Sequence, residues 1–290
     1  GTYWYHSHSG FQETAGLFGP LIIDPIDPEP FSYQRDYLVM LSDWTDLNPV
    51  ALAARLKKMS SYDNYYRQTV GDFVRDAEKN GFKATAKDRR MWGAMRMSPT
   101  DLSDVNAHTY TYLMNGTTAL GNWTGLFKAG EKVRLRFINA AAMTYFDVRV
   151  PGLKMTVVAV DGQYVHPVTV DEFRMAVAET IDVLVEPSGQ DVFTIFAQDS
   201  ARSGYVSGTL AVREGLRAPV PPLDPRPLLT MVDMGMGSMD HGEMAGMDMA
   251  GADHGKSTVW HPASEQGNPL VDNQAMNPVS RLADQATVCA

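Results

Sequence analysis

Two histidines near the start of the sequence, His6 and His8, stand one residue apart and follow the aromatic run Tyr3 to Tyr5. In a β-strand, alternate side chains project from the same face, roughly 6 to 7 Å apart at a rise of ~3.3 Å per residue. Imidazole nitrogen binds copper, zinc, iron and nickel, so the pair predicts a metal-binding strand without selecting the metal. Taken alone, such a pair more often consists of unrelated surface histidines, and two ligands cannot complete a site.

A second group of candidate ligands is soft. Thioether sulfur favours Cu(I), and imidazole adds nitrogen donors. Seven of the 17 methionines fall within nineteen consecutive residues near two histidines. A flexible linker is the alternative, and both can hold, but linkers normally consist of Gly, Ser, Pro and charged residues, so the methionine density favours metal capture. The candidate ligands are Met231, Met234, Met236, Met239, His241, Met244, Met247, Met249 and His254.

The remaining residues of these types are isolated. His108, His166 and His261 have no neighbouring ligand in the sequence, so we expect structural roles for them. Cys289 is the single cysteine, and it cannot form an internal disulfide. Because no histidine adjoins it, we interpret it as an incidental thiol.

Composition limits the classes of function. The 290 residues are 44% hydrophobic, which predicts about two globular domains. The 25 basic residues against 34 acidic ones give a net charge of -9 without a basic stripe, so nucleic acid is not an expected partner. The longest apolar runs are strand-sized, which predicts no transmembrane segment. Because the sequence opens inside a strand-like run without a signal peptide, we interpret the start as truncated.

The first hundred residues predict β-strands followed by helices. Residues 1–30 contain two short β-rich runs separated by Gly and Pro, as in the last strands of a domain. The run Tyr37 to Leu41 is expected to open the next domain. Residues 48–98 then predict three helices, interpreted as an insertion covering a β domain.

Capping residues predict where these helices begin and end. Asn48 is expected to cap the first helix, and Gly81 to end the second. Thr85 and Asp88 resemble a capping box for the third helix.

From about residue 110 to 212 the apolar pattern has a period of two. Val133, Leu135 and Phe137 alternate with Arg134, Arg136 and Ile138. Short strands at this spacing, separated by Gly, Pro and Asp turns, predict an antiparallel sandwich or barrel. Residues 214–228 are Pro-rich and predict a linker. Further strands are expected at 146–150, 155–160, 181–185, 192–196 and 205–212.

The context of the histidine pair resembles a known family. Residues 1–8, GTYWYHSH, followed by residues 16–23, GLFGPLII, closely resemble the second copper-ligand motif of multicopper oxidases. Four further segments resemble the middle cupredoxin domain of that family, namely 113–116, 133–139, 160–162 with Pro167, and 179–186. The helical insertion and the Met-rich stretch are similar to the copper-resistance protein A branch, and the likeness extends from residue 1 to about 280.

The resemblance implies an all-β chain of cupredoxin-like Greek-key sandwich or barrel domains with a helical insertion. It also implies that His6 and His8 are catalytic metal ligands, each binding a different copper of the type 3 pair. The acceptor that holds the second nitrogen of each ring cannot be identified from sequence. The implied divisions are 1–30, end of a first cupredoxin domain; 31–106, connecting segment with the insertion; 107–213, second cupredoxin domain without copper; 214–258, linker; and 259–290, unassigned.

Two family motifs have no counterpart here, namely H-x-H-G upstream and His-Cys-His downstream. The ligands of the type 1 and type 2 coppers are therefore expected outside this chain, and the chain alone is expected to be inactive. In full-length form the resemblance implies a periplasmic oxidase that couples one-electron oxidation of Cu(I) or a phenolic substrate to reduction of O₂ to water, in copper resistance. A non-enzymatic periplasmic copper-sequestering protein is the alternative, and a two-domain copper reductase would need its own His-Cys-His motif.

Overall fold

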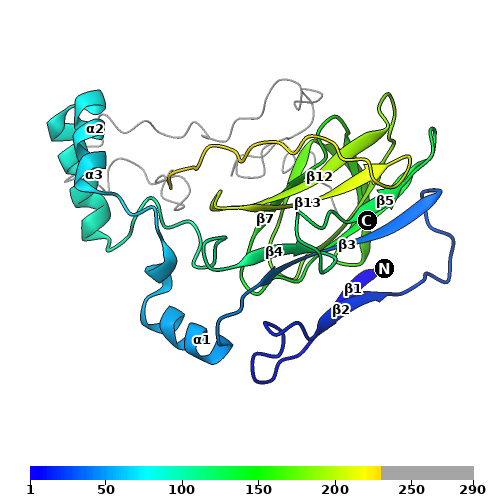
Figure 1. Ribbon diagram of the computed structural model, residues 1–290, viewed down its shortest axis with the longest axis horizontal. Helices are drawn as coiled ribbons and strands as arrows, with labels where there is room; N and C mark the ends of the chain where they lie inside the picture. The colour runs from blue at the N-terminus through cyan, green and yellow to red at the C-terminus, as the bar shows by residue number, and fades with distance from the viewer. Residues whose placement is uncertain (230–290) are drawn as a thin grey trace.

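Period-two runs of Val, Leu, Ile and Phe give the strands an apolar face, and these faces pack together as a sandwich of two sheets (Figure 1). The structure, a computed structural model, describes residues 1–229. One sheet has the order β4-β3-β6-β11-β8-β9 and the other β10-β7-β12-β13-β5. Their strands are β3 (Arg35–Trp44), β4 (Thr111–Met114), β5 (Thr124–Leu126), β6 (Val133–Asn139), β7 (Phe146–Arg149), β8 (Met155–Val160), β9 (Gln163–Val170), β10 (Glu172–Met175), β11 (Thr180–Val185), β12 (Val192–Asp199) and β13 (Tyr205–Ala211).

The predicted all-β class with a helical insertion is confirmed, but the prediction of an antiparallel arrangement is wrong in two places. β3 pairs in parallel with β6, and β13 pairs in parallel with β5. Each parallel pair joins strands far apart in the sequence, so no tight turn forces them to run in opposite directions. The run Tyr37 to Leu41 lies inside β3, a strand within the six-stranded sheet.

In strand β6 the alternating apolar residues face the core as predicted, but the arginines between them are buried too. Val133, Leu135 and Phe137 face the core between the sheets, as their spacing predicts. Arg134 and Arg136 point to the opposite face, yet every residue of the strand is buried. The outer face of this sheet is therefore covered, which the polar residues on it did not indicate.

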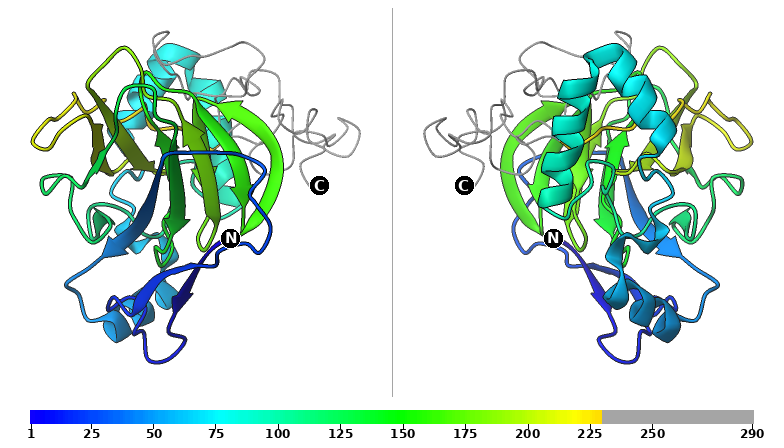
Figure 2. Two further views of the ribbon diagram at one scale, coloured as in Figure 1. Left: turned by 90° about the vertical axis from the view of Figure 1, so that its right-hand side faces the viewer. Right: turned by 90° about the vertical axis from the view of Figure 1, so that its left-hand side faces the viewer.

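The covering element is a hairpin of β1 (Thr2–His6) and β2 (Phe18–Ile22), paired antiparallel with His6 opposite Phe18. Trp4 and Phe18 pack on a small apolar cluster of the six-stranded sheet that includes Met40 and Ile138. Figures 1 and 2 show the hairpin lying beside β3, outside the sandwich. The N-terminal motif is thus attached to the sheet through its aromatic residues.

Four short helical elements lie between β3 and β4, namely α1 (Pro49–Lys58), a 3-10 turn at Ser60–Asp63, α2 (Val70–Asn80) and α3 (Phe82–Ala94). The predicted cap is confirmed, since the Asn48 side chain accepts hydrogen bonds from the backbone of residues 50 and 51. Gly81, with a φ of 88°, ends α2 as predicted.

The predicted capping box at Thr85 and Asp88 is wrong. The box belongs to α2 and consists of Thr69 and Asp72. Because α3 begins directly after Gly81, Thr85 already lies within that helix, where its hydroxyl donates to the Gly81 carbonyl at 3.0 Å.

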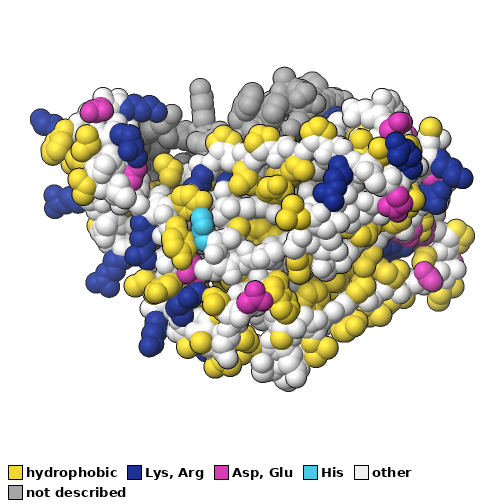
Figure 3. All heavy atoms as spheres, in the orientation of Figure 1, with side chains coloured by type: hydrophobic (Ala, Val, Ile, Leu, Met, Phe, Trp, Pro, Cys, Tyr) yellow, Lys and Arg dark blue, Asp and Glu magenta, His cyan; other side chains and the backbone are white. Residues whose placement is uncertain are grey.

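The insertion does not cover a face of the sheets as expected. α1 contributes Leu52 to the core, but α2 and α3 pair with each other beyond one end of the sandwich (Figures 1 and 2). Figure 3 shows many Lys and Arg side chains gathered over this helical end of the viewed face. No helix within residues 1–229 combines the length and the apolar content that crossing a membrane requires.

The Pro-rich segment expected to be a linker is packed on the sandwich within its described part. The buried Asp224 carboxylate accepts hydrogen bonds from Arg149 at 3.0 and 3.1 Å. Thr194 donates to the Pro219 carbonyl at 3.0 Å, and the backbone of Leu229 donates to that of Pro99 at 2.8 Å. The Met-rich stretch, with His241, His254 and Cys289, lies outside the described residues.

Candidate metal centre

The two histidines of the N-terminal motif lie side by side. His6 is the last residue of β1, and His8 follows two residues later on an exposed loop. Their ring centroids are 4.5 Å apart, with the rings meeting edge to face at 62°. The predicted pairing of the rings is confirmed, although the strand ends at His6 and does not extend to His8.

Trp4 fixes the plane of the His6 ring. The two ring centroids are 4.3 Å apart with an interplanar angle of 32°, so the rings lie partly stacked. The Trp4 indole Nε1 donates to the carbonyl of Ala178 at 3.2 Å. Since Ala178 precedes β11, this contact ties the ring that supports His6 directly to the sandwich.

The loop that joins β1 to β2 folds back toward His6. Ser7 Oγ donates to Gln12 Oε1 at 2.7 Å and accepts from the backbone N–H of Ser9 at 3.2 Å. The backbone of Leu17 donates to the carbonyl of Gln12 at 2.9 Å, which closes the loop. These bonds hold the residue after Gln12 close to His6.

That residue, Glu13, places Oε2 2.9 Å from Nδ1 of His6. The Nδ1 atom is buried, and the carboxylate oxygen lies outside the direction of a proper hydrogen bond, so Nδ1 lacks a bonded partner among the described residues. Sequence reasoning missed Glu13. Its only signal was an acidic residue seven positions after His6, and nothing in the spacing shows that the loop returns.

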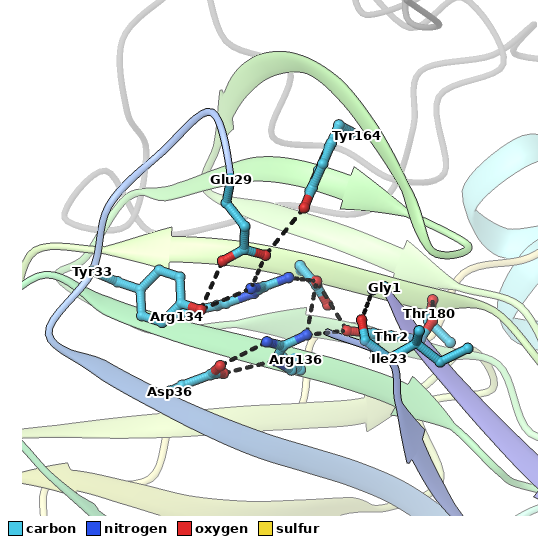
Figure 4. A network of polar contacts seen from close by, with 11 residues as sticks. Gly1, Thr2, Ile23, Glu29, Tyr33, Asp36, Arg134, Arg136, Tyr164 and Thr180 are labelled. Atoms are coloured by element: carbon cyan, nitrogen blue, oxygen red, sulfur yellow. Dashed lines mark hydrogen bonds and ion pairs between the residues drawn. The ribbon is translucent and has the colours of Figure 1, made fainter. Parts of the chain in front are cut away.

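The far end of β1 is anchored by buried polar groups (Figure 4). Thr2 is 1% exposed, and its hydroxyl donates to Asp182 at 3.0 Å while accepting from Arg136 at 3.0 Å. Thr180 of β11 donates to the Thr2 carbonyl at 3.0 Å, and Arg136 forms a bidentate pair with Asp36 of β3 at 2.7 Å. Thr2 thus connects the histidine-bearing strand directly to β11 and β6, and through Arg136 to β3.

A second arginine extends this network to the segment after β2. Arg134 is fully buried and pairs with Asp182 at 2.5 Å and Glu29 at 2.7 Å (Figure 4). Burial works against its charge, but the two carboxylates outweigh burial and raise the pKa of Arg134. For Glu29, burial acts to raise the pKa, but hydrogen bonds from Tyr33, Arg134 and Tyr164 outweigh it and lower the pKa. Glu29 thus ties the segment after the hairpin to the same buried network.

Two imidazoles are suitable donors for copper, but they do not complete a site. Within residues 1–229, no group of three or more His, Cys, Asp or Glu side chains is arranged to hold a metal ion. His108 lies against the rings of Tyr65 and Tyr66, at 4.8 and 5.4 Å, and His166 is exposed on β9. The described residues thus offer two imidazole donors here and no third ligand beside them.

Comparison with known proteins gives two family matches. Residues 35–215 match the model of a family described as multicopper oxidase, and residues 1–28 match a second model with that description. "Copper resistance protein A" of Escherichia coli is 58% identical over 98% of this chain and 53% of that protein. The protein of that name from Pseudomonas syringae pv. tomato is 55% identical over 98% of this chain and 54% of that protein.

Solved structures give the same fold. The multicopper oxidase Fet3p, described as functioning in iron import, aligns with a TM-score of 0.54 and 19% identity over 76% of this chain and 36% of that chain. At this identity the likeness concerns the fold, and it confirms the expected cupredoxin-like class. The chain spans about half the length of the curated relatives it matches.

Proposed function

Because the chain belongs to the multicopper oxidase family, we propose that it is an internal part of a copper-dependent oxidase in which His6 and His8 bind copper. The observation that carries the proposal is the placement of the two imidazoles side by side at the end of β1. Their supply of only two donors agrees with a site that is completed by ligands outside residues 1–229.

In the proposed site, His6 and His8 each bind a different copper of the type 3 pair. Copper bound there supplies the one-electron redox chemistry through which O₂ is reduced to water. The residues of this chain hold the ligands in place. Trp4 fixes the plane of one ring, and Thr2 fixes the strand against the six-stranded sheet. Fixed ligand geometry lets the site bind and react without first ordering these side chains.

The substrate and location are also proposed. We expect Cu(I) or a phenolic compound to be the electron donor, copper resistance to be the role, and the periplasm to be the location, in line with the relatives described as copper resistance proteins. The Met-rich stretch, with Met231, Met234, Met236, Met239, Met244, Met247 and Met249 as candidates, is proposed to capture Cu(I). Sequestration of copper without catalysis is the competing function.

Substitution of the histidines in the full-length, copper-loaded protein tests the proposal. His8→Ala should lower oxygen consumption with Cu(I) or a phenol by more than about 100-fold, because loss of a ligand costs more than the 10–100-fold of an outer-shell partner. Bound copper should decrease while the blue absorption of the type 1 copper remains.

His166→Ala, an exposed histidine on β9, is the matched control and should leave activity unchanged. Loss of the blue absorption in His8→Ala would contradict the assigned role. Oxygen consumption unaffected by substitution of either histidine would contradict their role as ligands, and its absence from the unaltered protein would favour sequestration.

A further inference from the structure

We propose that Glu13 is a positioning residue for His6, and that its carboxylate fixes the ring tautomer with the proton on Nδ1, so that Nε2 is offered to copper. This inference rests on the proposed function of His6 as a ligand. It starts from the 2.9 Å separation between Glu13 Oε2 and His6 Nδ1.

The chemistry of the two groups sets the direction of the proton. A neutral imidazole carries one N–H and one lone pair, while an ionised carboxylate only accepts hydrogen bonds. The proton of His6 is therefore stabilised on the nitrogen that faces Glu13, which leaves the lone pair on Nε2. A ligating histidine commonly donates its other N–H to a carboxylate in this way, which orients the ring and raises its basicity.

Burial of the ring atoms agrees with this assignment. The His6 side chain is 28% exposed, but its Nδ1 atom is buried and has no properly directed hydrogen bond within the described part of the chain. The exposure thus belongs to other atoms of the side chain. A metal that approaches from solvent cannot reach the buried Nδ1.

The loop presents Glu13 in a fixed position. Its carbonyl accepts from the backbone N–H of Gly16 at 2.8 Å, and the preceding residue, Gln12, is held by the Ser7 hydroxyl at 2.7 Å. With only 26% of its side chain exposed, Glu13 is not a freely rotating surface residue. An ordinary surface pair would need no such support.

Trp4 and Glu13 act on different motions of the His6 ring. Stacking on Trp4 restricts the tilt of the ring plane. It does not oppose a half-turn about the Cβ–Cγ bond, which would exchange the positions of the ring edges. The carboxylate lies 2.9 Å from one edge of the ring, so it distinguishes that edge from the other.

The tautomer can be observed directly. In the full-length, copper-free protein labelled with ¹⁵N-histidine, the His6 resonances are assigned by their loss in His6→Ala. They should show a protonated Nδ1 and an unprotonated Nε2. In Glu13→Ala this pattern should shift toward protonation of Nε2. A protonated Nε2 in the unaltered protein would overturn the proposal.

Copper retention gives a second measurement. When the copper-loaded, full-length protein is dialysed against a Cu(I) chelator, Glu13→Ala should lose copper from this pair about tenfold faster or more. Glu13→Gln should be intermediate, because its amide oxygen still accepts the N–H but carries no charge. Asp24→Asn, which removes a negative charge from an exposed position after β2, should behave as the unaltered protein.

The outcomes separate the two proposals. If His6→Ala retains all its copper, the proposed role of His6 is wrong. If His6→Ala loses copper while Glu13→Ala keeps it at the normal rate, only the role of Glu13 is wrong. A thermal midpoint in Glu13→Ala equal to that of Asp24→Asn shows that faster loss does not reflect unfolding. If that midpoint is lower and the tautomer unchanged, Glu13 is structural and the positioning role is rejected.

Discussion

At the scale of single residues, the strand that carries His6 is anchored by buried polar side chains that bond to one another. The hydroxyl of Thr2 makes two hydrogen bonds with charged partners, Asp182 and Arg136, where water is excluded. A buried charged group that loses its partner keeps its desolvation cost, so removing a hydroxyl here should cost more than at the surface. Thr2 therefore has a larger influence on the site than its small side chain suggests.

We predict that Thr2→Val lowers the free energy of unfolding by about 1–3 kcal/mol, because Asp182 and Arg136 each lose a hydrogen-bond partner. Amide hydrogen exchange in β1 and β2 should increase most, since the hairpin loses its anchor. Urea unfolding and exchange measurements check this. Thr2→Ser, which keeps the hydroxyl, is the control, and equal stability of Thr2→Val and Thr2→Ser would show that the anchor is unimportant.

At the scale of elements, α2 is stabilised mainly by interactions within the helical insertion, beginning with its capping box. The side chain of Thr69 accepts from the backbone of Asp72 at 3.2 Å, and the Asp72 carboxylate accepts from the backbone of Thr69 at 2.6 Å. Because α2 has no buried residue, this box and its packing against α3 support the helix instead of a core. The helical end is thus expected to unfold independently of the sheets.

Thr69→Ala should destabilise α2 by about 1 kcal/mol, because the backbone N–H of Asp72 in the first turn loses its acceptor. Amide exchange in residues 70–80 should become faster while exchange in the sheets stays unchanged. Thr69→Ser keeps the cap and serves as the control. Faster exchange throughout the sandwich would instead mean that the insertion and the sheets unfold as one unit.

At the scale of the whole molecule, ion pairs buried between strands make stability depend on pH. Burial acts to raise the pKa of Asp147, but contacts with Arg174 at 2.7 Å and Arg202 at 2.6 Å outweigh burial and lower the pKa. The pKa of Glu29 is lowered as well. Burial raises the pKa of Asp43, which offsets part of their effect in acid.

We predict a loss of stability in acid as these carboxylates take up protons. An acid whose pKa is lower in the folded state stabilises the fold fully above its unfolded value, ~4 for Asp and Glu, and this contribution disappears as pH falls through the folded value. The free energy of unfolding should therefore decrease as the pH drops below about 4. Urea unfolding between pH 7 and pH 3 measures this change.

Asp147→Asn tests the source of this dependence. It should cost about 3–5 kcal/mol at pH 7, because the buried Arg202 and the partly exposed Arg174 both lose a charged partner. The difference from the unaltered protein should shrink as the pH falls below about 4. An unfolding free energy that is constant from pH 7 to pH 3 in the unaltered protein would contradict the prediction.

The sequence alone determined the features that depend on neighbouring residues. The alternation in residues 133–138 identified a strand with its core face, Asn48 and Gly81 marked helix ends, and the His-x-His spacing placed two imidazoles side by side, while their role as metal ligands stays a prediction. In each case the information lies within a few residues, because strand periodicity and capping are local. The division into domains and the roles of the Met-rich stretch stay predictions.

Only the tertiary structure decided the rest. Arg134 and Arg136 occupy positions that read as an exposed polar face, yet they are buried because residues about 100 or more positions earlier in the chain fold over them. Glu13 comes within 2.9 Å of His6 only because the loop between β1 and β2 folds back. The free energy of these contacts comes from burial and charge pairing between distant segments, and no periodicity in the sequence encodes which segments meet.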